Sequence, residues 1–221
     1  MRSAGPVARG ALSLPWHSGV PPEASFRRGL FRQPVARVAR ALLGARLVSS
    51  VDGGRSAGVI VETEAYGGTD DPASHAATRR GRTVRNAAMF GRPCHAYVYR
   101  SYGLHWCVNV VTGEEGDPQA VLLRGLDPIE GVALMLRRRS GRLPLAAGPG
   151  RLCEALGIAG SLNGHDLRQP PLRLEPGWSV DDGLIGVSGR IGVRTAADRP
   201  LRFFVDGSVG VTRGPRRTVG E

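Results

Sequence analysis

Two glutamates stand two positions apart at the end of an apolar run. The run begins at Gly58, reads GVIVETEAY, and carries Glu62, Glu64 and Tyr66. Alternate residues of a β-strand point to the same face, so the two carboxylates would lie side by side. A carboxylate placed next to a pocket can act as an acid or a base. A solvent-facing strand edge is the plainer interpretation, and the pattern alone favours it.

All four tyrosines of the chain lie in the same stretch, between residues 58 and 109. Tyr97 and Tyr99 would share one face of a strand, and Tyr102 stands beside Gly103 in a turn, where a side chain can project outward. Such tyrosines can pack in a core, or they can stack on nucleobases beside a basic surface. The residues leave both interpretations open.

Two polar residues interrupt runs that otherwise predict apolar strands. Asn109 lies within LHWCVNVV, and Arg124 lies within AVLLRGL. A strand asparagine among valines is either hydrogen-bonded in the core or lines a polar pocket. A guanidinium in an apolar strand needs a carboxylate or a ligand as its partner. We expect Glu64 to be the partner of Arg124.

Histidines and cysteines near these strands raise the question of a metal site. Their spacing matches no zinc pattern such as paired C-x-x-C, and Cys107 is most simply a small buried hydrophobic residue. We therefore expect no metal ion. The three cysteines are few and odd in number, which fits free thiols in a reducing compartment.

The charge of the chain restricts its partners and its chemistry. A net charge of +11 over 221 residues favours a polyanionic partner or an anionic surface. All 30 basic residues are arginine, which codon bias can explain. Because no lysine is present, covalent catalysis through a lysine Schiff base is excluded. No apolar run reaches 18 residues, so we expect no membrane span.

The elements that must position these residues can be predicted along the chain. Helical spacing between Pro and Gly predicts helices over 34–43 and 148–156, and Asp127-Pro128 predicts the start of a helix that runs to Leu136. Residues 86–90 suggest a short helix. Runs rich in β-formers predict strands at 46–51, 58–63, 95–99, 104–111, 120–126, 184–187, 190–193 and 201–205.

Over about residues 30–206, motifs in the same order resemble the alkyladenine (3-methyladenine) DNA glycosylase family. The motifs are IVETEAY, the His of DPASHAATRRG, RN-x-x-MF, YVY-x-x-YG, the Asn of CVNV, LLRGLDP, GPGRLCEALGI and RIGV…RPLRFFV. The resemblance implies an α+β fold, a single mixed domain with a curved, mostly antiparallel sheet surrounded by helices. We expect a disordered Pro/Gly-rich tail over 1–25, with a targeting segment as the alternative, a glycosylase domain over 26–212, and a basic, frayed C-terminus over 213–221.

The implied activity is that of a DNA glycosylase of base-excision repair that uses no cofactor. Such an enzyme flips an alkylated or deaminated purine (3-methyladenine, 7-methylguanine, hypoxanthine or etheno-adenine) out of duplex DNA and hydrolyses its N-glycosidic bond, leaving an abasic site. We expect a monofunctional enzyme, because strand cleavage usually needs an amine nucleophile and the chain has no lysine. One flipped base needs only one subunit, so we expect a monomer. The location would be cytoplasmic, at the nucleoid, in a bacterium and nuclear in a eukaryote.

The resemblance gives roles to individual residues. Glu64 corresponds to the general base that activates water, and Arg124 corresponds to an arginine beside that water. The flipped base would be sandwiched by Tyr66, His75 and Tyr99.

Further residues correspond to the parts of the family's site that select the base and hold DNA. Asn109 would discriminate against a 2-amino group on guanine, and Tyr102 would fill the gap left in the base stack. The segment GLHWC replaces a version richer in Met and Phe, so the pocket lining is expected to differ. Phosphates would be bound by Arg79, Arg80, Arg82 and Arg85.

Two other functions remain open on the sequence. A non-catalytic protein that binds structured nucleic acid could use the same tyrosines and arginines. A hydrolase of nucleotide-like small molecules could use the same glutamates. The charge and the turn tyrosine Tyr102 argue against the small-molecule hydrolase, because a free nucleoside offers no duplex to wedge.

Overall fold

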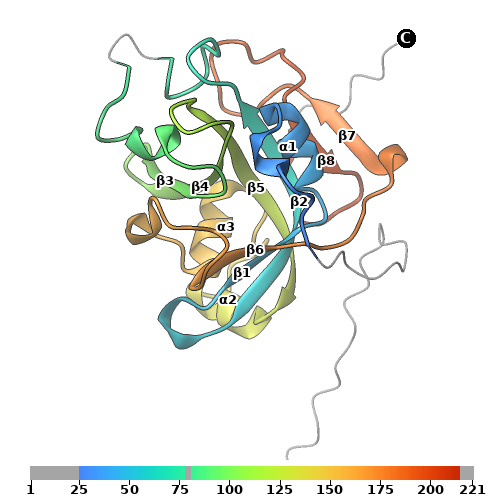
Figure 1. The fold of residues 1–221 in the computed structure, drawn as a ribbon. Coiled ribbons are helices and arrows are strands. Elements are labelled where there is room, and N and C mark those ends of the chain that lie inside the picture. Colours follow the sequence, from blue (N-terminus) through green and yellow to red (C-terminus); the bar gives the residue numbers. More distant parts are fainter. Residues whose placement is uncertain (1–24, 78–80, 215–221) are drawn as a thin grey trace, which may run out of the picture.

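The computed structural model describes residues 25–77 and 81–214, and its fold is drawn in Figure 1. The described residues form three α-helices, α1 (Val35–Ala41), α2 (Val132–Arg138) and α3 (Pro149–Leu156). Their strands are β1 (Arg46–Ser49), β2 (Ser56–Tyr66), β3 (Ala96–Ser101), β4 (His105–Thr112), β5 (Gln119–Glu130), β6 (Leu172–Glu175), β7 (Ile185–Ser188) and β8 (Arg202–Val205). Short 3-10 turns cover Leu30–Arg32, Val51–Gly53, Ala87–Phe90, Gly160–Leu162 and Asp182–Leu184.

All eight strands belong to one curved sheet in which every pairing is antiparallel. Its order is β3-β4-β5-β2-β1-β6, while β8 pairs with β2, and β7 pairs with β8. In Figure 1 the β3–β4 hairpin and the β7–β8 pair lie on opposite sides of β2 and β5. The predicted α+β class, with a curved antiparallel sheet in a single mixed domain, is confirmed.

Strand β2 holds the centre of the sheet because it pairs with three other strands. β5 runs along one side of it; on the other side β1 pairs with its first half and β8 with Glu62–Glu64. Every residue of β2 from Ser56 to Ala65 is buried. The solvent-facing interpretation of Glu62 and Glu64 is therefore wrong, because β8 covers what would otherwise be an edge.

The helices follow from the sequence signals that predicted them. α1 begins after Pro34 and buries Val35, Val38 and Ala39, which recur at helical spacing. α3 has Pro149 in its first turn and ends at Gly157, whose φ of 69° is left-handed. α1 packs against β2 and α3 against β4, so both helices bury their apolar faces on the sheet.

The helix predicted to start at Asp127-Pro128 is wrong. β5 continues to Glu130, and α2 begins only at Val132. The Asp127 carboxylate accepts hydrogen bonds from chain beyond β8 instead of capping a helix. Pro128 lies opposite Gly58 at a register shift, where a strand tolerates the missing N–H.

One further strand prediction is wrong, and one strand is missing from the predictions. Residues 190–193 form a loop, although their alternation is typical of a strand, and β6 was not predicted at all. The other predicted strands are present, with shifted ends. The three cysteines are buried free thiols, as expected. In the described part of the chain, no helix has both the length and the apolar character needed to cross a membrane.

Candidate active site

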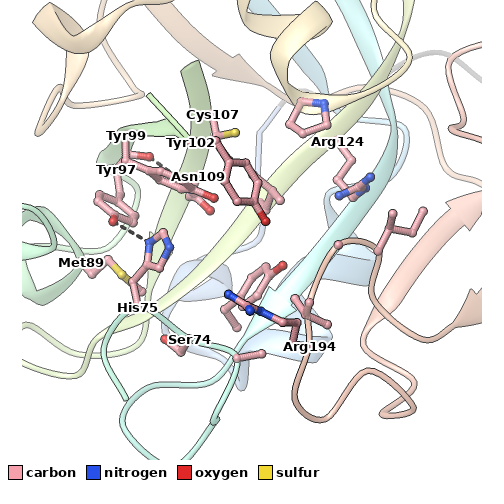
Figure 2. Close-up of a pocket in the computed structure, with 18 of the residues that line it drawn as sticks. Ser74, His75, Met89, Tyr97, Tyr99, Tyr102, Cys107, Asn109, Arg124 and Arg194 are labelled. Atoms are coloured by element: carbon pink, nitrogen blue, oxygen red, sulfur yellow. Dashed lines mark hydrogen bonds between the residues drawn. The ribbon is translucent and has the colours of Figure 1, made fainter. Parts of the chain in front are cut away.

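A cavity of about 750 Å³ is lined by the β3–β4 hairpin, the loop after β2 and the loop after β7 (Figure 2). Its lining includes six of the residues singled out in the sequence: Tyr66, His75, Tyr99, Tyr102, Asn109 and Arg124. Its volume lies in the range of pockets that bind small ligands, which suits a purine nucleotide. The structure therefore brings these six residues together around one cavity.

Glu64 lies directly behind this lining and is fully buried. Its Oε1 accepts a hydrogen bond from the backbone N–H of Ile191 (2.7 Å), and its Oε2 accepts one from the hydroxyl of Tyr66 (2.8 Å). Arg124 places Nη1 3.4 Å from Oε2. A carboxylate has about four lone-pair sites, so three donors from the described residues leave room for a fourth.

Burial raises the pKa of the Glu64 carboxyl above its ordinary value. Arg124, the Ile191 N–H and the Tyr66 hydroxyl each favour the ionised form and offset part of that rise. The result is a carboxylate that lies behind the cavity wall, shielded from bulk solvent, and that binds a proton more readily than an exposed glutamate. Both properties suit a general base.

Arg124 reaches the glutamates because of a β-bulge. Thr63 lies opposite Leu123 and Glu62 lies opposite Gly125, so Arg124 is an additional residue of β5 without a partner in the register. A bulge re-aims side chains locally, and here the guanidinium contacts both Glu62 and Glu64. The expected partnership of Arg124 with Glu64 is confirmed, and Glu62 is a second partner that was not expected.

The aromatic wall of the cavity comes mainly from β3 and the loop after β2. His75 lies 4.5 Å from Tyr99 between ring centroids, at 78°, and Tyr97 stacks on Tyr99 at 5.3 Å. His75 Nδ1 is 2.9 Å from the Tyr97 hydroxyl. Figure 2 shows these three rings gathered together, away from Arg124. Burial and the nearby Arg85 lower the pKa of His75, which favours the neutral imidazole.

Tyr97 and Tyr99 both contact a small second core and both line the cavity, but they are buried to different extents. Tyr97 is 1% exposed and packs with Met89 in a small second core. Tyr99, one full strand period further along, is only partly buried and lines the cavity next to Tyr66. Both interpretations of Asn109 hold. Its amide nitrogen donates a hydrogen bond to the Tyr97 carbonyl (2.9 Å), and the residue also lines the cavity.

Tyr102 projects from the turn between β3 and β4, as expected. Its side chain is 87% exposed. Its φ of 49° and that of Gly103, 70°, are both left-handed, a conformation that a tight hairpin turn requires. An aromatic ring is thus held in solvent at the rim of the cavity.

Of the four arginines predicted to bind phosphate, Arg82 and Arg85 lie in the described residues, whereas Arg79 and Arg80 lie outside them. Both described arginines are exposed. Arg85 lines the cavity and lies over the Tyr99 ring, 5.4 Å from its centroid.

The sequence did not identify the loop after β7 as part of the site. Ile191, Val193, Arg194 and Thr195 line the cavity, and Ile191 also holds Glu64. Arg190 fixes this loop by an ion pair with Asp71 and by packing over the Tyr66 ring. The motif RIGV is part of the family resemblance, but its pattern predicts a strand and gives no sign of this role.

A metal site has no support in the described geometry. Across residues 25–77 and 81–214, no three His, Cys, Asp or Glu side chains are grouped as they would be around a metal ion. His105 lies at the start of β4, and Cys107 lines the cavity as a buried thiol.

Comparisons with known proteins show the family of this chain. A sequence model of the family described as "Methylpurine-DNA glycosylase (MPG)" matches residues 29–209. Relatives named "Putative 3-methyladenine DNA glycosylase" include one from Granulibacter bethesdensis, 49% identical over 188 residues (83% of this chain, 85% of the relative). Those from Nitrosospira multiformis and Methanoculleus marisnigri are each 47% identical, over 178 residues (80% and 88%) and 189 residues (83% and 96%). The chain therefore belongs to the methylpurine-DNA glycosylase family, a family of hydrolases that act on N-glycosyl bonds.

Proposed function

We propose that this chain excises damaged purines from duplex DNA as a monomeric, monofunctional glycosylase of base-excision repair. The substrates would be of the 3-methyladenine, 7-methylguanine, hypoxanthine and etheno-adenine class. One observation carries the proposal: Glu64 is buried behind an aromatic cavity and accepts from three donors of the described residues, which leaves about one of its four lone-pair sites unused.

The chemistry needs a carboxylate in this position. Breaking a purine N-glycosidic bond builds positive charge on the sugar, as in the transition states of glycoside hydrolysis. Glu64 would accept a proton from the attacking water and stabilise that charge. Arg124 would keep Glu64 ionised between turnovers, because an opposite charge favours the charged form.

The aromatic cavity would hold the flipped base. Tyr66, His75 and Tyr99 offer ring surfaces, and a cationic alkylpurine over such rings gains on the order of 0.5–2 kcal/mol. A neutral imidazole at His75 adds no charge that would repel such a base. Neutral lesions lack this gain and depend on hydrogen bonds, for which Asn109 lies in the lining.

Tyr102 supports the base-flipping part of the proposal. Unstacking a nucleotide costs a few kcal/mol, and an aromatic ring that enters the gap offsets part of this. Tyr102→Ala is expected to lower single-turnover excision about tenfold, the equivalent of about 1.4 kcal/mol. The free energy of unfolding should change by less than about 0.5 kcal/mol, because the side chain is 87% exposed.

The control for this variant is Leu143→Ala, which removes a comparably exposed apolar side chain (73%) from the loop after α2. Leu143→Ala should leave the excision rate unchanged. Equal rates for wild type and Tyr102→Ala would show that this ring takes no part in extruding the base.

The experiment that tests the function is release of free base by wild type from duplex oligomers with a single hypoxanthine or etheno-adenine, and from methylated genomic DNA. Release from methylated DNA alone would restrict the substrates of the enzyme to cationic lesions. Addition of borohydride should trap no covalent DNA adduct, because the chain contains no lysine. Binding without release from any substrate would instead support the non-catalytic nucleic-acid binder.

A further inference from the structure

A second glutamate, Glu62, lies close to Glu64, the proposed general base. It accepts four hydrogen bonds, whereas Glu64 accepts three. Glu62 is 0% exposed. Its Oε1 accepts hydrogen bonds from Arg124 Nε (3.1 Å), Arg202 Nε (2.7 Å) and the Thr212 hydroxyl (2.6 Å). Its Oε2 accepts one from the Thr212 backbone N–H (2.8 Å). Nothing in the proposed chemistry so far uses this carboxylate.

Glu62 and Glu64 share one guanidinium between them. Arg124 directs Nε to Glu62 and Nη1 to Glu64, and its side chain is only 8% exposed. The contact to Glu62 (3.1 Å) is closer than that to Glu64 (3.4 Å). Because Glu62 engages Nε, Arg124 meets Glu64 through one nitrogen rather than in a two-nitrogen fork, which is the stronger arrangement. Glu62 thus limits how strongly Arg124 neutralises Glu64.

Thr212 belongs to a segment after β8 that lies beyond residue 209, where the family match ends. The segment is fixed at several points. The Asp127 carboxylate accepts from the Gly210 N–H (2.8 Å), and Arg202 Nη2 donates to the Thr212 carbonyl (3.1 Å). A Cβ at Gly214 would lie 2.5 Å from Ile191 Cδ1. The segment therefore packs against the residue whose backbone N–H holds Glu64.

We propose that Glu62 and Thr212 are positioning residues for base excision: Thr212 completes the hydrogen bonding of Glu62, and Glu62 holds Arg124 so that only one of its nitrogens reaches Glu64. This inference rests on the proposed function, in which Glu64 is the general base. It adds two residues, one of them outside the matched family region, that act on the reaction through Arg124 without touching DNA.

The physical consequence concerns the strength of the base. Without the Glu62 charge, Arg124 is free to turn fully onto Glu64 and form a two-nitrogen ion pair. A closer opposite charge lowers the pKa of a carboxyl, and a less basic carboxylate is a poorer proton acceptor. The negative charge of Glu62 also raises the pKa of Glu64 directly, so a lower pKa in a Glu62 variant does not by itself separate positioning from the loss of that charge. Thr212→Val removes no charge, and it therefore tests the positioning role on its own.

The first test is Thr212→Val, which removes the hydroxyl donor but keeps the shape and the backbone N–H. We expect single-turnover excision to fall about tenfold with unchanged affinity for damaged DNA, because small displacements of catalytic groups have effects of this size or larger. Thr212→Ser should restore the rate. Thr63→Val is the matched control: it removes a buried hydroxyl bonded to the Ala39 carbonyl (2.9 Å) from the adjacent position of β2, and should cost stability but not rate.

The second test is the pH profile of Glu62→Gln, measured on folded protein. The acidic limb of its excision rate should move to lower pH than in wild type, and the plateau should fall. Should Glu62→Gln fail to fold, Thr212→Val and its serine rescue decide the question. Active wild type with unchanged rates in Thr212→Val and an unmoved limb in Glu62→Gln would overturn this inference alone. A wild type that releases no base would overturn the proposed function, and this inference with it.

Discussion

Replacing Glu64 by glutamine is expected to lower single-turnover base release by about 10²- to 10⁴-fold, the usual contribution of a positioned general base. Glutamine has nearly the same shape, so the cavity and its aromatic wall should persist. Affinity for DNA that contains a damaged purine should therefore stay within about twofold. The measurement is the release of free base under single-turnover conditions, together with a direct binding titration of the same duplex.

The control is Glu130→Gln, which neutralises a glutamate that forms a surface ion pair with Arg55. That variant should excise at the wild-type rate. If Glu64→Gln released base as fast as wild type, water would be activated elsewhere, and the three donors around Glu64 would have only a structural role.

The same substitution has a consequence for stability, whose sign follows from the raised pKa of Glu64. A carboxyl whose pKa is higher in the folded than in the unfolded state favours folding when it is protonated. Its contribution is fully present below about pH 4.5, the ordinary value, and is lost as the pH rises through the raised pKa. Glutamine does not ionise, so Glu64→Gln does not lose stability at this position as the pH rises. Its stability relative to wild type should thus increase with pH, while wild-type excision should decrease as the pH falls through the same raised pKa.

Arg124→Met is expected to have the largest effect on stability, a loss of about 3–5 kcal/mol at neutral pH. Methionine fills similar space but leaves the buried Glu64 without its nearby cation, while Glu62 retains Arg202. The loss should shrink at low pH, because protonated Glu64 needs no cation. Urea unfolding of wild type and variant at two pH values measures both effects.

Arg82→Met is the control for this prediction, since Arg82 is exposed and forms no ion pair among the described residues. Its effect should stay within about 0.5 kcal/mol. A loss of less than about 1 kcal/mol in Arg124→Met would mean that water or a shift of the chain compensates Glu64.

Local patterns in the sequence predicted what depends on neighbouring residues. Helix α1, the β1–β2 hairpin and the turn that exposes Tyr102 follow from short-range signals. The pairing of Arg124 with Glu64 followed from elementary electrostatics, because a guanidinium in an apolar strand needs an anion. The motifs of the family added the roles of individual residues.

Contacts between distant parts of the chain could not be predicted in this way. The burial of Glu62 depends on β8, which brings Arg202 from 140 positions away. Tyr97 and Tyr99 share one strand face and both line the cavity, yet Tyr97 is almost fully buried and Tyr99 only partly, a difference that strand alternation does not predict. Residues 190–193 alternate like a strand, but Arg190 is held by Asp71 and the segment curves around Glu64 instead.

The span of these contacts along the chain has a consequence for biosynthesis. A ribosome adds residues from the N-terminus, and every aromatic ring that lines the cavity has been made once Tyr102 has been added. Glu64 must wait for Ile191, which follows it by 127 positions, and Glu62 waits for Thr212, 150 positions later. Domains fold as whole units during synthesis. A nascent chain thus contains the aromatic residues of the cavity long before Ile191 and Thr212, which hold the two buried glutamates, have been synthesised.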